Sequence, residues 1–228
     1  MVKIIKKYLS QFTLIYELKT RKLNKSKSFF DPDNAIWFFG CSHVFGCGVE
    51  LDETAPIRLE TLIDKPVINY GVLASGPMMV EYQLNDLLKK HKPLAVVIAW
   101  PSFNRWQSGN ILRFPLFWLP SCLEDGYVPT AIDHVGCKNV WPEKWEEYKN
   151  LVLTGQLEKD NLELVKRVRK QLKNYPRVEF QYFPDSYTMK LPTPAYPFLD
   201  IGNDGVHCGP LTQIKIAEWV KDELQLLL

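Results

Sequence analysis

The chain has 228 residues, of which 46% are hydrophobic and 24% charged, and its 28 basic and 26 acidic residues give a formal net charge of +2. This composition is that of an ordinary globular protein and excludes a disordered, collagen-like or coiled-coil chain. No apolar run reaches the roughly 18 residues that a membrane-spanning helix needs. The net negative charge of residues 29–228 disfavours a basic nucleic-acid-binding protein.

Five cysteines lie between Cys41 and Cys208, and no two of them form a C-x-x-C pair. An odd number without paired spacing favours reduced thiols over a disulfide framework. The first residues also lack the basic, apolar and small-residue pattern of a secretory signal. We therefore expect a cytoplasmic protein.

Residues 1–28 form a basic arm, with eight lysines and arginines and a single acidic residue, Glu17. Apolar residues recur there at helical spacing, with most lysines on the other side. Two interpretations stay open: the helix lies on an acidic membrane surface, or its apolar side packs on its own domain or on a second subunit. Residues 29–228 carry a net negative charge and are predicted to form one domain.

Strands and helices alternate along residues 29–228. Short apolar runs predict four strands, at residues 35–39, 66–70, 94–100 and 177–183. Helical spacing predicts helices at 54–63, 77–91 and 211–227, and one long helix within 145–174 that is clearest from 157 to 172. This alternation implies a parallel sheet covered on both faces, that is, a three-layer α/β/α sandwich.

Ligands of such folds bind at the carboxyl ends of the strands, so the loops that follow the strands are the candidates for a functional site. The first loop, residues 40–48, is rich in glycine but lacks the lysine of a phosphate-binding P-loop. It also has Leu51 where a dinucleotide-binding loop has its third glycine. The loop then serves to present Ser42, whose hydroxyl is a weak nucleophile unless a base activates it.

A base with an orienting acid occurs in the loop before the last helix, as Asp204 and His207. In one turn, the carboxylate can accept a hydrogen bond from one ring nitrogen and leave the other free as a base, which is the logic of an acid–base–nucleophile triad. The alternative is a helix-capping aspartate beside a surface histidine.

The loops after the second and third strands offer groups for an oxyanion or an anionic substrate. Small residues at 71–77 let backbone N–H groups face a ligand, and Asn104 carries a side-chain N–H. Arg105 could bind an anionic group. A plain strand–turn–helix junction and a solvated loop would contain the same residues, so both interpretations stay open.

Taken in order, these loops resemble the sequence blocks of the SGNH (GDSL-like) hydrolase family. The stretch Gly-Cys-Ser-His-Val-Phe-Gly-Cys-Gly-Val at 40–49 is similar to the family's nucleophile block, and the resemblance covers about residues 35–106 and 200–228. It implies a flavodoxin-like α/β/α sandwich and ester hydrolysis or acyl transfer. By this resemblance Ser42 is the nucleophile, His207 the general base and then acid, and Asp204 the residue that orients His207.

The resemblance also implies an oxyanion hole built from the Ser42 N–H, a second-loop N–H and the Asn104 side chain. Counting from Asn69 places Ala74 at the position of the family's second glycine, with Gly76 two residues further on. Either residue can supply the donor, because the donor is a backbone N–H.

Two other positions depart from the family pattern. Cys41 stands where the family usually has an aspartate that supports the loop. The third block, usually Gly-x-Asn-Asp, is replaced by Trp100-Pro-Ser-Phe-Asn104-Arg105. Arg105 is therefore an alternative to Asn104 as the functional residue of that block.

Five of the seven tryptophans lie between Trp100 and Trp145. This insertion, about residues 101–145, has little helical or strand periodicity and is expected to fold over the active end of the sheet. We predict that Trp100, Trp106 and Arg105 contact the substrate, since aromatic faces with a few polar groups suit sugars as well as acyl chains. The alternative is a hydrophobic cluster that seals one edge of the fold.

We therefore expect a serine hydrolase of the SGNH type that cleaves an ester, such as an O-acyl group on a carbohydrate, through a Ser–His–Asp triad and an acyl-enzyme. Two alternatives stay open: an O-acyltransferase with the same triad, and a catalytically inactive glycan-binding module. No histidine and cysteine spacing matches a zinc site. We expect no metal and no cofactor, and the expected partner is a small-molecule or glycan ester.

Overall fold

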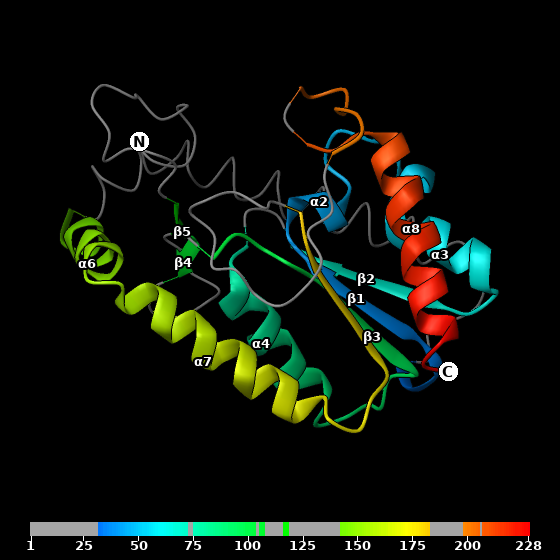
Figure 1. Cartoon of the computed structure of the whole chain (residues 1–228), viewed down its shortest axis with the longest axis horizontal. Coiled ribbons are helices and arrows are strands. Elements are labelled where there is room, and N and C mark those ends of the chain that lie inside the picture. The colour runs from blue at the N-terminus through cyan, green and yellow to red at the C-terminus, as the bar shows by residue number, and fades with distance from the viewer. Residues whose placement is uncertain are drawn as a thin grey trace, which may run out of the picture. The chain divides into compact units, whose positions relative to one another are not determined.

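The computed structural model describes residues 32–72, 75–103, 105–107, 116–118, 142–182, 198–205 and 207–228 (Figure 1). The predicted arm at 1–28, most of the insertion, and the candidate residues Ala74 and Asn104 lie outside these residues. The division of the chain into an arm and one domain stays a prediction.

Four parallel strands form the central sheet: β1 (Ile36–Gly40), β2 (Val67–Gly71), β3 (Ala95–Trp100) and β6 (Arg177–Gln181). They lie in the order β2-β1-β3-β6. β1 and β3 are buried along their whole length, as expected for apolar strands that are covered on both faces. The predicted parallel sheet is confirmed, and each strand lies close to its predicted position.

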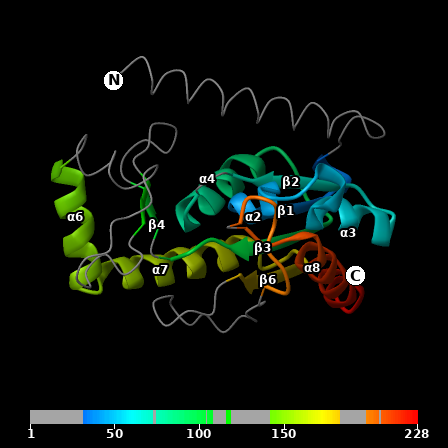
Figure 2. The ribbon, with the colours of Figure 1, turned by 90° about the horizontal axis from the view of Figure 1, so that it is seen from above.

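Helices cover both faces of this sheet, which confirms the predicted three-layer sandwich (Figures 1 and 2). One face carries α3 (Ala55–Ile63) and α8 (Pro210–Gln225), and the other carries α4 (Pro77–Leu87) and α7 (Gln156–Gln171). These four helices are the predicted ones, with ends that differ by a few residues.

Successive residues of β1 point to opposite faces of the sheet and so enter two separate cores. Phe38 packs in one core cluster with Leu59 of α3. Its neighbour Trp37 packs in the other with Leu84 of α4 and Val168 of α7. Both cores therefore meet at the central strand, whose carboxyl end is held rigidly from both sides.

The order of the strands locates the ligand-binding edge. The chain adds β2 on one side of β1 and then β3 on the other side. In open parallel sheets, ligands bind at the carboxyl ends of the strands beside such a reversal. The loop that carries Ser42 leaves β1 at this point.

The helix predicted within 145–174 is α7, and a second helix that was not predicted precedes it. Two helices are present, α6 (Pro142–Leu153) and α7, and Gly155 separates them with a backbone φ of 68°. A left-handed residue ends a helix, and glycine adopts that conformation without the penalty that a Cβ imposes. The apolar spacing from 157 to 172 belonged to α7 alone.

The insertion also contains regular structure that its sequence did not indicate. β4 (Arg105–Gln107) and β5 (Leu116–Trp118) pair antiparallel, with Trp106 opposite Phe117. Strands of three residues are too short to display a period of two. The remaining elements are the 3₁₀ turns η1 (Pro32–Asn34) and η2 (Leu51–Glu53) and the short helix α2 (Ser42–Phe45). None of the described helices is both long and apolar enough to cross a membrane.

Candidate active site

Ser42 is the first residue of α2, immediately beyond the carboxyl end of β1. The backbone of Cys41 is extended, so the chain leaves the sheet and enters the helix at once. Asn69 of β2 holds this helix in place: its Nδ2 donates to the Val44 carbonyl at 2.8 Å, and its Oδ1 accepts the Gly71 N–H at 2.8 Å. The serine is only 6% exposed, and its hydroxyl has a fixed position at the ligand-binding edge.

The structure brings Ser42, His207 and Asp204 into one hydrogen-bonded chain. His207 Nε2 lies 2.8 Å from Ser42 Oγ, and His207 Nδ1 lies 2.6 Å from Asp204 Oδ2. The other carboxylate oxygen, Oδ1, accepts the backbone N–H of His207 at 3.0 Å. His207 stands 165 positions beyond the serine, so only the fold places the imidazole and its carboxylate beside it.

The hydrogen-bond roles in this chain follow from the chemistry of its members. An ionised carboxylate can only accept, so Asp204 requires the proton of His207 on Nδ1. Nε2 then has a free lone pair and accepts from the Ser42 hydroxyl. This is the arrangement in which an imidazole can remove a serine proton.

The glycine-rich first loop packs against the loop that carries Asp204. Gly48 has a φ of 80°, and a Cβ there would lie 2.7 Å from Asp204 Oδ1. The Gly48 carbonyl accepts the Asn203 N–H at 2.8 Å, and a Cβ on Gly202 would lie 2.6 Å from the same carbonyl oxygen. The glycines allow the two loops to approach closely. The sequence showed the glycines but not what approaches them.

The loop of Asp204 and His207 is closed at its base and attached to α8. Gly202 N–H donates to the His207 carbonyl at 2.8 Å. The Asp200 carboxylate accepts the N–H groups of Leu211 at 2.9 Å and Thr212 at 2.8 Å. Burial would raise the pKa of Asp200, but the hydrogen bonds from Thr212 and Leu211 outweigh it and hold that pKa below its ordinary value. The start of α8 thus fixes the position of the loop that carries His207.

The second loop lies against the same end of β1. Ser75 is fully buried, and its hydroxyl donates to the Gly40 carbonyl at 3.2 Å. A Cβ on Gly76 would lie 2.8 Å from the Arg105 carbonyl oxygen, so packing against β4 explains this glycine. Since Ala74 and Asn104 lie outside the described residues, the N–H groups of the oxyanion hole remain predictions.

Arg105 and Trp106, predicted to bind substrate, both belong to β4. Arg105 Nη1 donates to the Ser75 carbonyl at 3.1 Å, which ties β4 to the second loop. The indole of Trp106 stacks on the ring of Tyr148 in α6, with centroids 6.1 Å apart and planes at 16°. Both side chains are half-buried; Arg105 supports the second loop, and Trp106 packs against α6.

Trp100 is a core residue, which corrects its predicted contact with substrate. Its side chain is 2% exposed, packs with Phe103, and donates its indole N–H to Glu179 Oε2 at 3.0 Å. As the last residue of a central strand, Trp100 points into the core on the side of α4 and α7. Its aromatic surface is therefore used in packing.

The cysteines beside the site are free thiols. Cys41, which stands in place of the family's aspartate, is buried, and so is Cys208. Burial raises the pKa of the Cys208 thiol to about 12, so it carries no thiolate at neutral pH. Over the described part of the chain, no group of three His, Cys, Asp or Glu residues is placed to hold a metal ion.

Neither a protein-family model nor a curated protein sequence matches the chain. Among solved structures, the chain is similar to the psychrotrophic esterase EstA from Pseudoalteromonas sp., inhibited by monoethylphosphonate. The two are 15% identical, the match covers 85% of this chain and 98% of that one, and the TM-score is 0.48. It is also similar to a family 3 carbohydrate esterase from Clostridium thermocellum, at 17% identity, over 85% and 98%, with a TM-score of 0.49.

A third similar structure is AlinE4, an SGNH-hydrolase family esterase, at 15% identity, over 67% of this chain and 60% of that one, with a TM-score of 0.36. At such identities these matches concern the fold. The α/β/α arrangement of this chain is shown by its own strand order and by the helices on both faces of the sheet.

Proposed function

We propose that the protein is a serine ester hydrolase in which Ser42 is the nucleophile, His207 the general base and acid, and Asp204 the residue that orients the imidazole. The observation that carries this proposal is the continuous chain from Ser42 Oγ through His207 to Asp204, with distances of 2.8 and 2.6 Å. A serine without such a base is a poor nucleophile, and a histidine without the carboxylate has no fixed tautomer.

The reaction has two halves. Ser42 Oγ attacks the ester carbonyl carbon while His207 Nε2 takes the hydroxyl proton. The tetrahedral intermediate then breaks its bond to the alcohol, which leaves with that proton. Water attacks the acyl-serine in the same way, with His207 again taking a proton, and the free acid leaves as the proton returns to Ser42.

The negative oxygen of each intermediate needs hydrogen-bond donors. We assign the Ser42 N–H, a second-loop N–H from Ala74 or Gly76, and the Asn104 side chain to this role. The hydrogen bonds from Ser75 to Gly40 and from Arg105 to Ser75 keep the second loop close to β1 and support this assignment. Each donor contributes about 3–4 kcal/mol to transition-state stabilisation in such sites.

For the substrate we propose an O-acyl group on a carbohydrate. Trp106 lies in β4, soon after β3, and its side chain is half-buried; one face of its ring stacks on Tyr148 of α6, and the aromatic-rich insertion lies between these two residues in the sequence. Aromatic faces bind the apolar faces of sugars while a few polar groups fix orientation. Arg105 stands at the same edge and would select substrates with an anionic group.

A fluorophosphonate probe tests the nucleophile. The wild-type protein is expected to be labelled on Ser42, and Ser42→Ala is expected to lose both labelling and release of acetate from an acetylated sugar. Ser102→Ala, a serine change in the loop after β3, serves as the matched control and is expected to be labelled like wild type.

Two results contradict the proposal in different ways. A folded wild-type protein that the probe does not label has no activated serine, and this result favours a binding module. Turnover only in the presence of an acceptor sugar, without acetate release into water, identifies an acyltransferase.

A further inference from the structure

His43, the residue after Ser42, lies directly behind the proposed base. Its side chain is 3% exposed within α2. The ring centroid is 4.8 Å from that of His207 and 4.8 Å from that of Tyr182, and 5.1 Å from that of Phe198. The His207 ring therefore has the Ser42 hydroxyl at its Nε2 and the edge of a second imidazole against it.

His43 also holds the backbone of the base loop. The N–H of Cys208, the residue after His207, donates to His43 Nδ1 at 3.4 Å. Cys208 is fully buried, and a buried amide needs such an acceptor. In return, the His43 carbonyl accepts the side-chain N–H of Gln213 in α8 at 2.9 Å. Ser42 and His43, consecutive in α2, therefore contact His207 and Cys208, consecutive in the loop before α8.

The imidazole of His43 is neutral at physiological pH. Burial lowers its pKa to about 3; a positive charge on His207 and the charge of Arg105 act in the same direction, and Asp204 acts against them. With Nδ1 as acceptor, the ring proton lies on Nε2. A neutral ring is required here, because His207 becomes an imidazolium in each half of the reaction and a second cation at this distance would oppose that charge.

We propose that His43 is a positioning residue, which fixes the ring and backbone of His207 against Ser42 through its Nδ1 acceptor and the contact between the two rings; this inference rests on the proposed function. It acts through His207 and not on the substrate. The positioning of His207 therefore depends on a hydrogen-bond acceptor at the place of Nδ1, and a polar side chain without an acceptor there is not sufficient.

A set of three variants isolates this acceptor. His43→Asn places an amide oxygen where Nδ1 stands, His43→Leu has the same shape without an acceptor, and His43→Gln has an amide one bond further out. We expect His43→Leu and His43→Gln to lose about tenfold to a hundredfold in kcat with KM unchanged, since small displacements of a catalytic group cost this much. His43→Asn is expected to keep most of the wild-type kcat.

The measurements are kcat and KM on an acetyl ester, the rate of fluorophosphonate labelling, and the thermal unfolding midpoint of each variant. Equal kcat for His43→Asn and His43→Gln, or a loss confined to KM, overturns the inference even if His43→Leu does not fold. If the wild type is labelled while all three variants match it, only the role of His43 fails. If the wild type itself is inert, the proposed function fails.

Discussion

At the scale of single residues, the candidate site depends on what each side chain can donate or accept. Asp204 uses both carboxylate oxygens on His207, one on the ring and one on the backbone N–H. This pairing sets both the tautomer and the orientation of the imidazole. The Asp204 side chain is nevertheless partly exposed, and the role proposed for it depends on geometry more than on burial.

Replacement of Asp204 by asparagine tests this geometry. An amide N–H would face Nδ1 and favour the tautomer with the proton on Nε2, which cannot accept from Ser42. We expect kcat to fall about 10⁴-fold with KM nearly unchanged. Asp52→Asn, an exposed acid in η2, is the control and is expected to leave kcat unaltered. A wild-type kcat in Asp204→Asn would remove Asp204 from the mechanism.

At the scale of elements, the site is made by loops that pack on one another. The loop of Gly48 supports that of Asp204, and Arg105 of β4 supports the second loop. Each contact requires backbone to approach backbone closely. The small residues in these loops are therefore needed for close packing. Close packing limits the size of a side chain more strictly than a turn in the chain does.

Alanine substitutions at two glycines with similar φ angles distinguish the effect of packing from that of backbone strain. Gly48 (φ 80°) faces Asp204, whereas Gly155 (φ 68°) has nothing within 4 Å of a built Cβ. Alanine at either position costs about 1–2 kcal/mol of backbone strain in the free energy of unfolding. Only Gly48→Ala is expected to lower kcat, because its methyl group displaces the carboxylate. Denaturant unfolding and ester hydrolysis measure the two effects, and equal kcat values would argue against the packing role.

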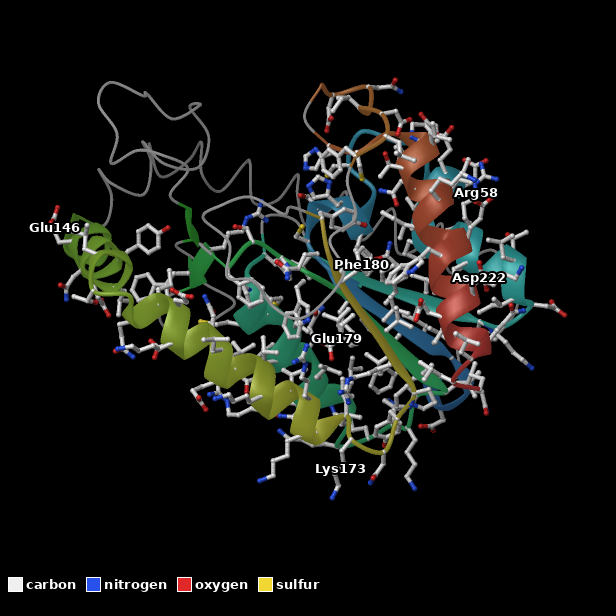
Figure 3. All side chains as sticks on the ribbon, viewed as in Figure 1. Arg58, Glu146, Lys173, Glu179, Phe180 and Asp222 are labelled. Atoms are coloured by element: carbon white, nitrogen blue, oxygen red, sulfur yellow. The ribbon has the colours of Figure 1, made fainter. Side chains whose placement is uncertain are left out.

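At the scale of the whole described domain, a buried carboxylate joins the sheet to one of the helices that cover it. Glu179 on β6 points toward α7 while its neighbour Phe180 points toward α8 (Figure 3). The carboxylate accepts from Trp100 of β3, from Arg169 of α7 at 3.1 Å, and from Arg177 at 2.8 Å. One buried carboxylate thus connects two strands and a helix.

The stability of this junction depends on pH. Burial would raise the pKa of Glu179, but hydrogen bonds from Arg169, Trp100 and Arg177 outweigh it and lower that pKa. Because the folded state has the lower pKa, the ionised carboxylate stabilises the fold above the unfolded pKa. This stabilisation is lost as the pH falls through the lowered folded pKa.

Glu179→Gln is expected to lower the free energy of unfolding by about 1–3 kcal/mol at pH 7, and the difference from wild type is expected to shrink in acid. Urea titrations at pH 7 and in acid measure this. Glu163→Gln breaks an exposed pair with Lys166 instead, and is expected to change stability by about 0–1 kcal/mol. A loss for Glu179→Gln that stayed constant with pH would contradict the charged junction.

The sequence predicted the elements whose signal is local. Continuous apolar runs marked β1 and β3, and apolar spacing marked α7, because burial on two faces or on one helix face leaves a direct trace in residue type. The helix α6, which ends before Gly155, and the pairing of β4 with β5 were missed. A single glycine and three-residue strands carry too little local signal.

For the site, the sequence by itself determined the chemistry: a hydroxyl after the first strand, and a carboxylate and an imidazole three residues apart before the last helix. Only the tertiary structure decided that the imidazole reaches the hydroxyl, that Trp100 belongs to the core, and that His43 lies behind His207. The physical reason is that contacts between residues 165 positions apart depend on strand order and on which loops pack together. No local pattern of residues encodes either of these.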